Sequence, residues 1–240
     1  AIDMAGAIYC WGANRYGQLG LGETGGERLF PEEIAQEGPW RDVAVGGEAT
    51  LAVSADGGLY SWGRFSGDGV PSCVEGGEPP CAPNNWRRVR FSQAESRCAS
   101  KADGSLWCWG TTVDGQLGIG PTELRQALAP TRVDLPALTE DASFDLAANQ
   151  DARLSSHGCA IAGGAMYCWG RDDRGQLGVG GPGQPAWSPM QVGDDNNWIA
   201  VDTGGHHSCG IQADGSLSCW GSFTFGQSGA AVTGLAFRPA

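Results

Sequence analysis

The sequence predicts an all-β protein built from a repeated unit of about four short strands. Three observations predict this fold class: Trp-Gly recurs five times, tight-turn dipeptides lie between the copies, and glycine and tryptophan are both abundant. The 40 glycines suit many turns, whereas the 10 tryptophans need a core in which to bury their rings. Disorder and long helices are therefore both disfavoured.

The Trp-Gly dipeptide marks the end of each repeat. Successive copies are separated by 51, 47, 60 and 51 residues. The tryptophans are Trp11, Trp62, Trp109, Trp169 and Trp220. Four copies are followed by a Gly-Gln turn, as in Gly17-Gln18-Leu19-Gly20, whereas the second has Phe65-Ser66-Gly67-Asp68-Gly69 and then an insertion.

A hairpin is predicted before each later Trp-Gly. Its first strand opens with an aromatic and an aliphatic residue, as in Trp40-Arg41-Asp42-Val43, and we expect Phe144-Asp145-Leu146 to be the equivalent in the fourth repeat. The turns are Asp56-Gly57, Asp103-Gly104, Gly163-Gly164 and Asp214-Gly215. These dipeptides tolerate the positive φ of a tight turn. Each repeat thus corresponds to one β-propeller blade.

The order of these motifs resembles the regulator of chromosome condensation repeat. The match includes Gly205-His206-His207-Ser208-Cys209, followed by Asp-Gly-x-Leu, Cys-Trp-Gly and Gly-Gln-Leu-Gly patterns, and it extends over nearly the whole chain. The resemblance implies a β-propeller with about five four-stranded blades in residues 1–240. A closed ring of this family has about seven blades, so we expect the segment to be truncated at both ends.

The cysteines recur in step with the repeats. Aligned on Trp-Gly, they pair as Cys98 with Cys108, Cys159 with Cys168, and Cys209 with Cys219. Each pair straddles a hairpin turn, so its members should lie opposite one another at disulfide distance. The second repeat lacks both positions together, with Leu51 and Ser61 in their place. In its insertion, Cys73 and Cys81 should close a loop with each other.

Cys10 has no partner within the chain under this scheme. The alignment places its partner at the position just before Ala1, which is a second reason to expect a segment of a longer protein. A free thiol and an intermolecular bridge are the alternatives.

Several disulfides persist only where reductants are absent, so we expect a periplasmic, cell-surface or secreted protein of the exported, cysteine-rich bacterial kind. There is no Cys-x-x-Cys and no cysteine–histidine spacing typical of zinc. A net charge of −12, with Lys101 as the single lysine, disfavours nucleic acid and anionic membranes as partners. No run is long and apolar enough for a membrane span.

Nothing in the sequence predicts an enzyme or a cofactor. Gly20–Gly25 and Gly178–Gly183 match the dinucleotide-binding fingerprint, but neither precedes a predicted helix. His206, His207 and Ser208 with Asp202 resemble a hydrolytic triad in composition only. Because His207 aligns with His157, we expect a structural position whose imidazole satisfies backbone groups.

Three acidic pairs are expected in connections between strands, with solvated side chains. They are Glu32-Glu33, Asp172-Asp173 and Asp194-Asp195. Calcium is the alternative, although none of the pairs has the alternating spacing of a calcium loop.

The most specialised surface should be the inserted loop Val70–Asn84, because functional variation concentrates on loops over a rigid scaffold. The candidate interaction residues, some in other loops, are Phe65, Val70, Glu75, Glu78, Trp187 and Phe223. Blade packing is the alternative role for the aromatic members. We expect a non-catalytic protein-interaction or scaffold module with a protein partner. The alternatives are a secreted inhibitor of an extracellular enzyme, similar to propeller inhibitors of β-lactamase, and a carbohydrate-binding propeller.

Overall fold

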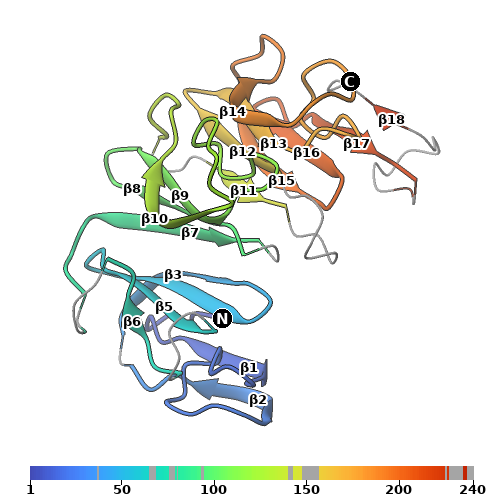
Figure 1. Ribbon diagram of the computed structural model, residues 1–240. Helices are drawn as coiled ribbons and strands as arrows, with labels where there is room; N and C mark the ends of the chain where they lie inside the picture. The colour runs from blue at the N-terminus through green and yellow to red at the C-terminus, as the bar shows by residue number, and fades with distance from the viewer. Residues whose placement is uncertain are drawn as a thin grey trace. The chain divides into compact units, whose positions relative to one another are not determined.

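The computed structural model describes residues 1–240 except 37, 65–68, 76–78, 80, 93–94, 140–142, 148–156, 225, 227–234 and 237–240. Every element of regular secondary structure among the described residues is a β-strand, from β1 to β18 (Figure 1). The chain divides into two compact units. Unit 1 comprises Ala1–Phe91 and Ala99–Ala102, and unit 2 comprises Ser92–Cys98 and Asp103–Ala240.

The strands form antiparallel sheets in which sequence neighbours are also spatial neighbours. The first sheet has two strands, β1 (Tyr9–Ala13) and β2 (Glu27–Glu33). Each of the other sheets in the described part of the chain has four strands. They are β3 (Trp40–Val45), β4 (Ala49–Ser54), β5 (Leu59–Gly63) and β6 (Ser72–Cys73); β7 (Trp86–Phe91), β8 (Arg97–Lys101), β9 (Leu106–Thr111) and β10 (Gln126–Arg132); β11 (Phe144–Leu146), β12 (His157–Ala162), β13 (Ala165–Gly170) and β14 (Ala186–Gln191); and β15 (Trp198–Thr203), β16 (His207–Gln212), β17 (Leu217–Ser222) and β18 (Leu235–Ala236).

These sheets confirm the predicted all-β repeat, with one difference in the first repeat. There, β1 and β2 correspond to the third and fourth strands of a complete sheet, since Trp11-Gly12 lies in β1 as Trp62-Gly63 lies in β5. Before β1, the described residues form a single antiparallel bridge, between Ile2 and Ile8.

The hairpin disulfides predicted from the sequence are present. Cys159 and Cys168 are directly paired across β12 and β13, with their Cα atoms 4.1 Å apart. The strands are joined by a two-residue turn at Gly163-Gly164, where both φ angles are positive, at 60° and 83°. This is the type I′ geometry for which Gly-Gly is suited. The other disulfides are Cys98–Cys108, Cys209–Cys219 and Cys73–Cys81.

The register of β11 corrects one alignment made from the sequence. Phe144 lies opposite Ala160, one residue beyond the disulfide cysteine Cys159. In β15 the same place is taken by Val201, which lies opposite Gly210 beside Cys209. Phe144 therefore stands at the aliphatic position of the repeat and not at the position of the leading tryptophan. The sequence pattern does not separate the leading aromatic position from the aliphatic position, because both are buried and both accept a large apolar side chain.

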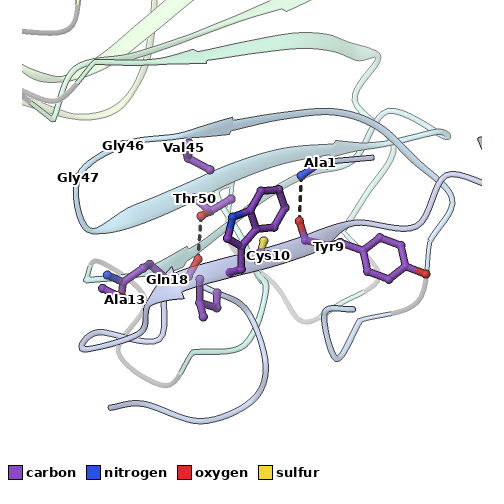
Figure 2. Close-up of a pocket in the computed structure, with 11 residues that line it drawn as sticks. Ala1, Tyr9, Cys10, Ala13, Gln18, Val45, Gly46, Gly47 and Thr50 are labelled. Carbon is purple, nitrogen blue, oxygen red and sulfur yellow. Dashed lines mark hydrogen bonds between the residues drawn. The ribbon is translucent and has the colours of Figure 1, made fainter. Parts of the chain in front are cut away.

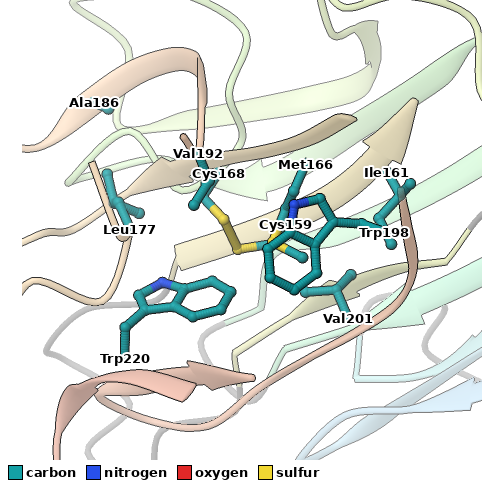
Figure 3. Close-up of a cluster of buried hydrophobic side chains, with 10 residues drawn as sticks. All are labelled: Cys159, Ile161, Met166, Cys168, Leu177, Ala186, Val192, Trp198, Val201 and Trp220. Atoms are coloured by element: carbon teal, nitrogen blue, oxygen red, sulfur yellow. A yellow bond between two sulfur atoms is a disulfide. The ribbon is translucent and has the colours of Figure 1, made fainter. Parts of the chain in front are cut away.

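Tryptophans from one sheet bury the hairpin of the preceding sheet. In unit 2, Trp198 and Trp220 join a cluster with Ile161, Met166 and the Cys159–Cys168 disulfide (Figure 3). The two indole rings meet edge to face, with their centroids 6.1 Å apart. In unit 1, Trp40 and Trp62 pack in the same way with Ile8, Cys10 and Leu19. The recurrence of large aromatic residues thus reflects stacking of successive sheets.

The tryptophans of the Trp-Gly dipeptides also hold the Gly-Gln turn of the preceding repeat. The indole Nε1 of Trp220 donates a 3.0 Å hydrogen bond to the backbone oxygen of Gln176. Trp62 donates to the oxygen of Gln18 and Trp169 to that of Gln116, each at 3.0 Å. We call this repeated contact the tryptophan–glutamine clamp. It joins consecutive repeats, and it explains why Trp-Gly and Gly-Gln recur together.

Candidate interaction loops

The inserted loop after β5 is fastened to the core of unit 1. Cys73 and Cys81 form its disulfide, with Cα atoms 5.3 Å apart. The backbone N–H of Cys81 donates a 2.9 Å hydrogen bond to the hydroxyl oxygen of Tyr60, and Cys81 packs in the same cluster as Trp40 and Trp62. The second cysteine therefore anchors the loop to the core.

Glu75 is exposed but firmly positioned by neighbouring donors. Its carboxylate accepts hydrogen bonds from Asn84 Nδ2 at 2.7 and 2.9 Å and from Trp86 Nε1 at 3.1 Å. The ammonium of Lys101 lies 4.4 Å from the centre of the Trp86 ring. Glu75 thus ties the loop to the start of β7, which reduces the entropy that the loop would lose on binding.

The other candidate residues differ in exposure. Val70 is 37 % exposed and Trp187 is partly exposed, whereas Phe223 is only 5 % exposed. For Phe223 this burial contradicts a role as an exposed anchor and agrees with the alternative role in blade packing. Phe65 and Glu78 lie outside the described residues. Val70 and Glu75 belong to unit 1 and Trp187 to unit 2, so these candidates do not form one site within either unit.

The acidic pairs do not share one environment, contrary to expectation. Asp172 is buried, and its carboxylate accepts a 3.0 Å hydrogen bond from the N–H of Leu177, so it caps the Gly-Gln turn. Burial raises the pKa of this carboxyl. Glu32 and Glu33 lie within strand β2 and not in a connection. Asp194 and Asp195 are exposed in the connection after β14, beside a cavity of about 370 Å³.

The glycine runs that match the dinucleotide fingerprint do not open a helix in the described part of the chain. Both glycine runs that match the dinucleotide fingerprint lie in loops, each followed by a strand, β2 or β14. Among the described residues, no group of three or more histidine, cysteine, aspartate or glutamate side chains is arranged to hold a metal ion. Nor does the described part of the chain contain a helix that could cross a membrane.

His157 makes its hydrogen bond to a serine side chain and not, as expected from the sequence, to backbone groups. Ser208 is hydrogen-bonded to His157 of the adjacent sheet, at 2.7 Å from Nε2, and both side chains are fully buried. Ser208 donates its own hydrogen to the oxygen of Gln176, so Nε2 of His157 is the donor in the first bond. His157 therefore reinforces the tryptophan–glutamine clamp through a side chain and not through backbone groups. A hydroxyl that is buried and already donating is unsuited to attack a substrate.

His157 should make stability depend on pH. Burial lowers its pKa from 6.5 to about 3, so the folded protein keeps the ring neutral while the unfolded chain binds a proton below pH 6.5. The free energy of unfolding should therefore fall on acidification below pH 6.5, by up to about 1.4 kcal/mol per pH unit from this group. His157→Gln should abolish this slope, and denaturant titrations of both proteins between pH 4 and 8 would measure it.

Asp145 should change the free energy of unfolding in the opposite direction between about pH 4 and pH 6. Its Oδ2 accepts hydrogen bonds from the backbone N–H and the hydroxyl of Thr203, at 3.0 and 2.8 Å. Burial, the largest cause, raises the pKa of Asp145 to about 6. Because the native state then retains a proton that the unfolded state loses, this group reduces stability as pH rises from about 4 to 6. The difference between wild type and His157→Gln isolates the histidine contribution, and a pH-independent difference would contradict it.

Comparison with known proteins identifies the repeat. The regulator of chromosome condensation (RCC1) repeat matches residues 5–53 and 163–211, and a second description of the same repeat matches residues 198–227. The ultraviolet-B receptor UVR8 of Arabidopsis thaliana is 34 % identical over 247 residues, covering 95 % of this chain and 52 % of that protein. Human HERC2, an E3 ubiquitin-protein ligase, is 28 % identical across the whole chain, which covers 5 % of that protein.

Solved structures support the same fold. Yeast RCC1 (Prp20), in its complex with Kap60, superimposes with a TM-score of 0.76 at 18 % identity, covering 98 % of this chain and 56 % of that one. Human WBSCR16 superimposes with a TM-score of 0.77 at 19 % identity, covering 98 % of this chain and 65 % of that one. The chain spans about half the length of UVR8 and of Prp20. With its repeated sheets and its clamp between repeats, the chain belongs to the RCC1 repeat family of β-propellers.

Proposed function

We propose that this chain is an exported, non-catalytic protein-interaction module that presents loops on a disulfide-stapled scaffold. The observation that carries the proposal is the recurrence of a disulfide at one register position in three successive hairpins. Such bonds persist in oxidising compartments and are rare where glutathione keeps thiols reduced. The cysteines of two of these disulfides, Cys98–Cys108 and Cys159–Cys168, are fully buried, which supports a structural role.

The protein-binding role is supported by the similar propellers. One solved structure is yeast RCC1 bound to Kap60, and another concerns the binding of Prp20p from Saccharomyces cerevisiae to Gsp1p and histones. Those partners belong to those proteins. For this chain, the fastened loop around Glu75 and the exposed Val70 beside it form the proposed contact surface.

The proposal predicts that a change at Val70 weakens partner binding without weakening the fold. Immobilised chain would be used to capture proteins from the extracellular fluid of the source organism, and the affinity of the recovered partner measured by calorimetry. Val70→Arg should reduce this affinity at least tenfold. Val113→Arg is the matched control, because Val113 is also an exposed valine in a loop but lies outside the insertion.

The result of the capture also separates the alternatives. A stoichiometric complex that abolishes the activity of one extracellular enzyme would assign the inhibitor role. Retention of glycans in place of proteins would assign the carbohydrate-binding role. Equal loss of affinity in the two arginine variants would remove the insertion from the binding surface.

A further inference from the structure

Two arginines stack on one tyrosine at the surface of unit 1. The guanidinium carbon of Arg15 lies 5.3 Å from the centre of the Tyr16 ring, and that of Arg64 lies 5.7 Å from it. Both distances fall within the range of about 6 Å over which a cation is attracted to an aromatic face. The two arginines are exposed, and Tyr16 is partly exposed. We call these three residues the arginine–tyrosine cluster.

The turn that carries Arg15 and Tyr16 is fixed by Gln18. The Oε1 atom of Gln18 accepts a 2.9 Å hydrogen bond from the backbone N–H of Tyr16. Its backbone oxygen accepts hydrogen bonds from the hydroxyl of Thr50 at 2.8 Å, which Figure 2 shows, and from Nε1 of Trp62 at 3.0 Å. The arginines thus stack on a ring whose backbone is held in place, and this reduces the side-chain entropy that they would lose on binding a partner.

Val70 adjoins the cluster through a close approach of two glycines. A Cβ atom added to Gly17 would overlap with the backbone of Gly69, and the N–H of Gly22 donates a 3.1 Å hydrogen bond to the oxygen of Gly69. Gly17 directly follows Tyr16, and Gly69 directly precedes Val70, which is 37 % exposed. One surface of unit 1 therefore presents two cations, an aromatic ring and an aliphatic side chain.

The equivalent turn of the fourth repeat is also exposed, although sheets precede and follow it in the chain. There, the backbone N–H of Arg174 donates a 2.8 Å hydrogen bond to Oε1 of Gln176, as that of Tyr16 does to Gln18. Asp173 and Arg174 thus stand where the first repeat has Arg15 and Tyr16, and both are exposed. Exposure at these two positions is a property of the turn itself.

The two turns differ in charge. Arg171 follows Trp-Gly in the fourth repeat as Arg64 does in the second, and its Nε lies 2.8 Å from Oδ1 of Asp173. In the first repeat, Arg15 takes the place of that aspartate. Arg64 pairs with Glu48 at 2.5 Å, whereas Arg15 forms no ion pair with the described residues. One positive charge of the cluster therefore lacks a counter-charge, in a chain whose formal net charge is −12.

We propose that the arginine–tyrosine cluster and Val70 bind an acidic, extended segment of a partner protein. A carboxylate of the segment pairs with Arg15, and an apolar side chain of the segment covers Val70 and the Tyr16 ring. The inference rests on the proposed function, because it names the chemistry of the partner for the surface that contains Val70. A guanidinium that stacks on a ring still presents N–H donors along its edge, which suits a carboxylate. Because the chain as a whole repels acidic segments, a locally positive surface would determine where such a segment binds.

The test uses a fluorescently labelled acidic peptide, Gly-Asp-Leu-Glu-Asp-Leu-Gly with blocked ends, titrated with the full chain and followed by anisotropy. The uncharged control peptide has asparagine and glutamine in place of aspartate and glutamate. Arg15→Ala removes the cation without a counter-charge, and Arg174→Ala removes an exposed arginine from the equivalent turn as the matched control. Tyr16→Phe keeps the aromatic ring, whereas Tyr16→Ser removes it. Urea unfolding would verify that each variant is folded.

We expect the acidic peptide to bind roughly tenfold more tightly than the uncharged one, because a charge-assisted contact is lost in the latter. Arg15→Ala should reduce the affinity for the acidic peptide by a similar factor, and Arg174→Ala should leave it unchanged. Tyr16→Phe should retain the affinity and Tyr16→Ser should reduce it severalfold, since the ring positions the guanidinium groups.

Equal losses of affinity in Arg15→Ala and Arg174→Ala would overturn the proposal, because the attraction would then be general. Binding that appears only after Asp68→Asn would also overturn it, since a carboxylate of the chain itself, at a position outside the described residues, would then occupy the cluster. A dimer in sedimentation that Arg15→Ala dissociates would assign a second copy as the occupant instead. None of these results affects the capture of a partner through Val70, so failure of the acidic peptide leaves the proposed function to be judged by its own experiment.

Discussion

Gly178→Ala is expected to destabilise the protein by about 2–5 kcal/mol, the sum of a left-handed alanine and an overpacked contact. Gly178 has a φ of +71°, and a Cβ atom there would lie 2.6 Å from Nε1 of Trp220. Relief of that contact would displace the indole and break its hydrogen bond to Gln176, which belongs to the clamp. Denaturant unfolding followed by tryptophan fluorescence and far-ultraviolet circular dichroism would measure the loss.

Gly215→Ala provides the matched control for this prediction. Gly215 also has a positive φ, +85°, but a Cβ atom added there would meet no other atom within 4 Å. Gly215→Ala should therefore lower the free energy of unfolding only through the unfavourable left-handed backbone of alanine, by about 1–2 kcal/mol. Equal losses in the two variants would show that the contact with Trp220 contributes nothing measurable.

Removal of the Cys159–Cys168 disulfide is the second change with a large expected effect. The double variant Cys159→Leu with Cys168→Ser should lose about 2–4 kcal/mol, because the bond restricts the unfolded chain. The choice of residues follows the protein itself, since Leu51 and Ser61 are paired at the same position of the second repeat. It leaves no unpaired thiol at this position, and the loss would be measured by urea unfolding under oxidising conditions.

Reduction of the wild-type protein serves as the comparison. A reductant should lower the stability of the wild type by more than that of the double variant, because the variant has one disulfide fewer to lose. If the variant were as stable as the oxidised wild type, the bond at Cys159 would have no stabilising role.

The repeat and its disulfides could be predicted because the residues that form them recur at regular intervals in the sequence. Trp-Gly fixes the end of the third strand in each complete sheet, and the cysteines lie at constant offsets from it, as Cys168 and Cys219 do. The joint replacement at Leu51 and Ser61 identified the two positions as partners. Local turn chemistry then placed Gly163-Gly164 in a two-residue turn.

Contacts between repeats could not be predicted in the same way. The sequence shows that Gln176 recurs in a turn, but not that its backbone oxygen receives Trp220 and Ser208 from the next sheet. The distance in sequence hides the pairing, although the joint recurrence of Gly-Gln and the following tryptophan was a usable signal. His157 was missed as the partner of Ser208 for the same reason.

The burial of individual loop residues also could not be predicted from the sequence pattern. Phe223 follows β17 and resembles an exposed loop residue in sequence, yet the fold buries it. Asp172 stands beside Asp173 in a polar stretch, but it caps the turn from within. Neither outcome follows from residue type, because each depends on the tertiary packing around the residue.

Mass spectrometry of protein taken from its native host, with free thiols alkylated at the moment of lysis or collection, tests the central claim most directly. The account predicts linked peptides containing Cys98 with Cys108, Cys159 with Cys168, and Cys209 with Cys219, without alkylation at these six residues. Full alkylation of the same cysteines in native material would contradict the assignment to an oxidising compartment and, with it, the role of the disulfides in holding the loops.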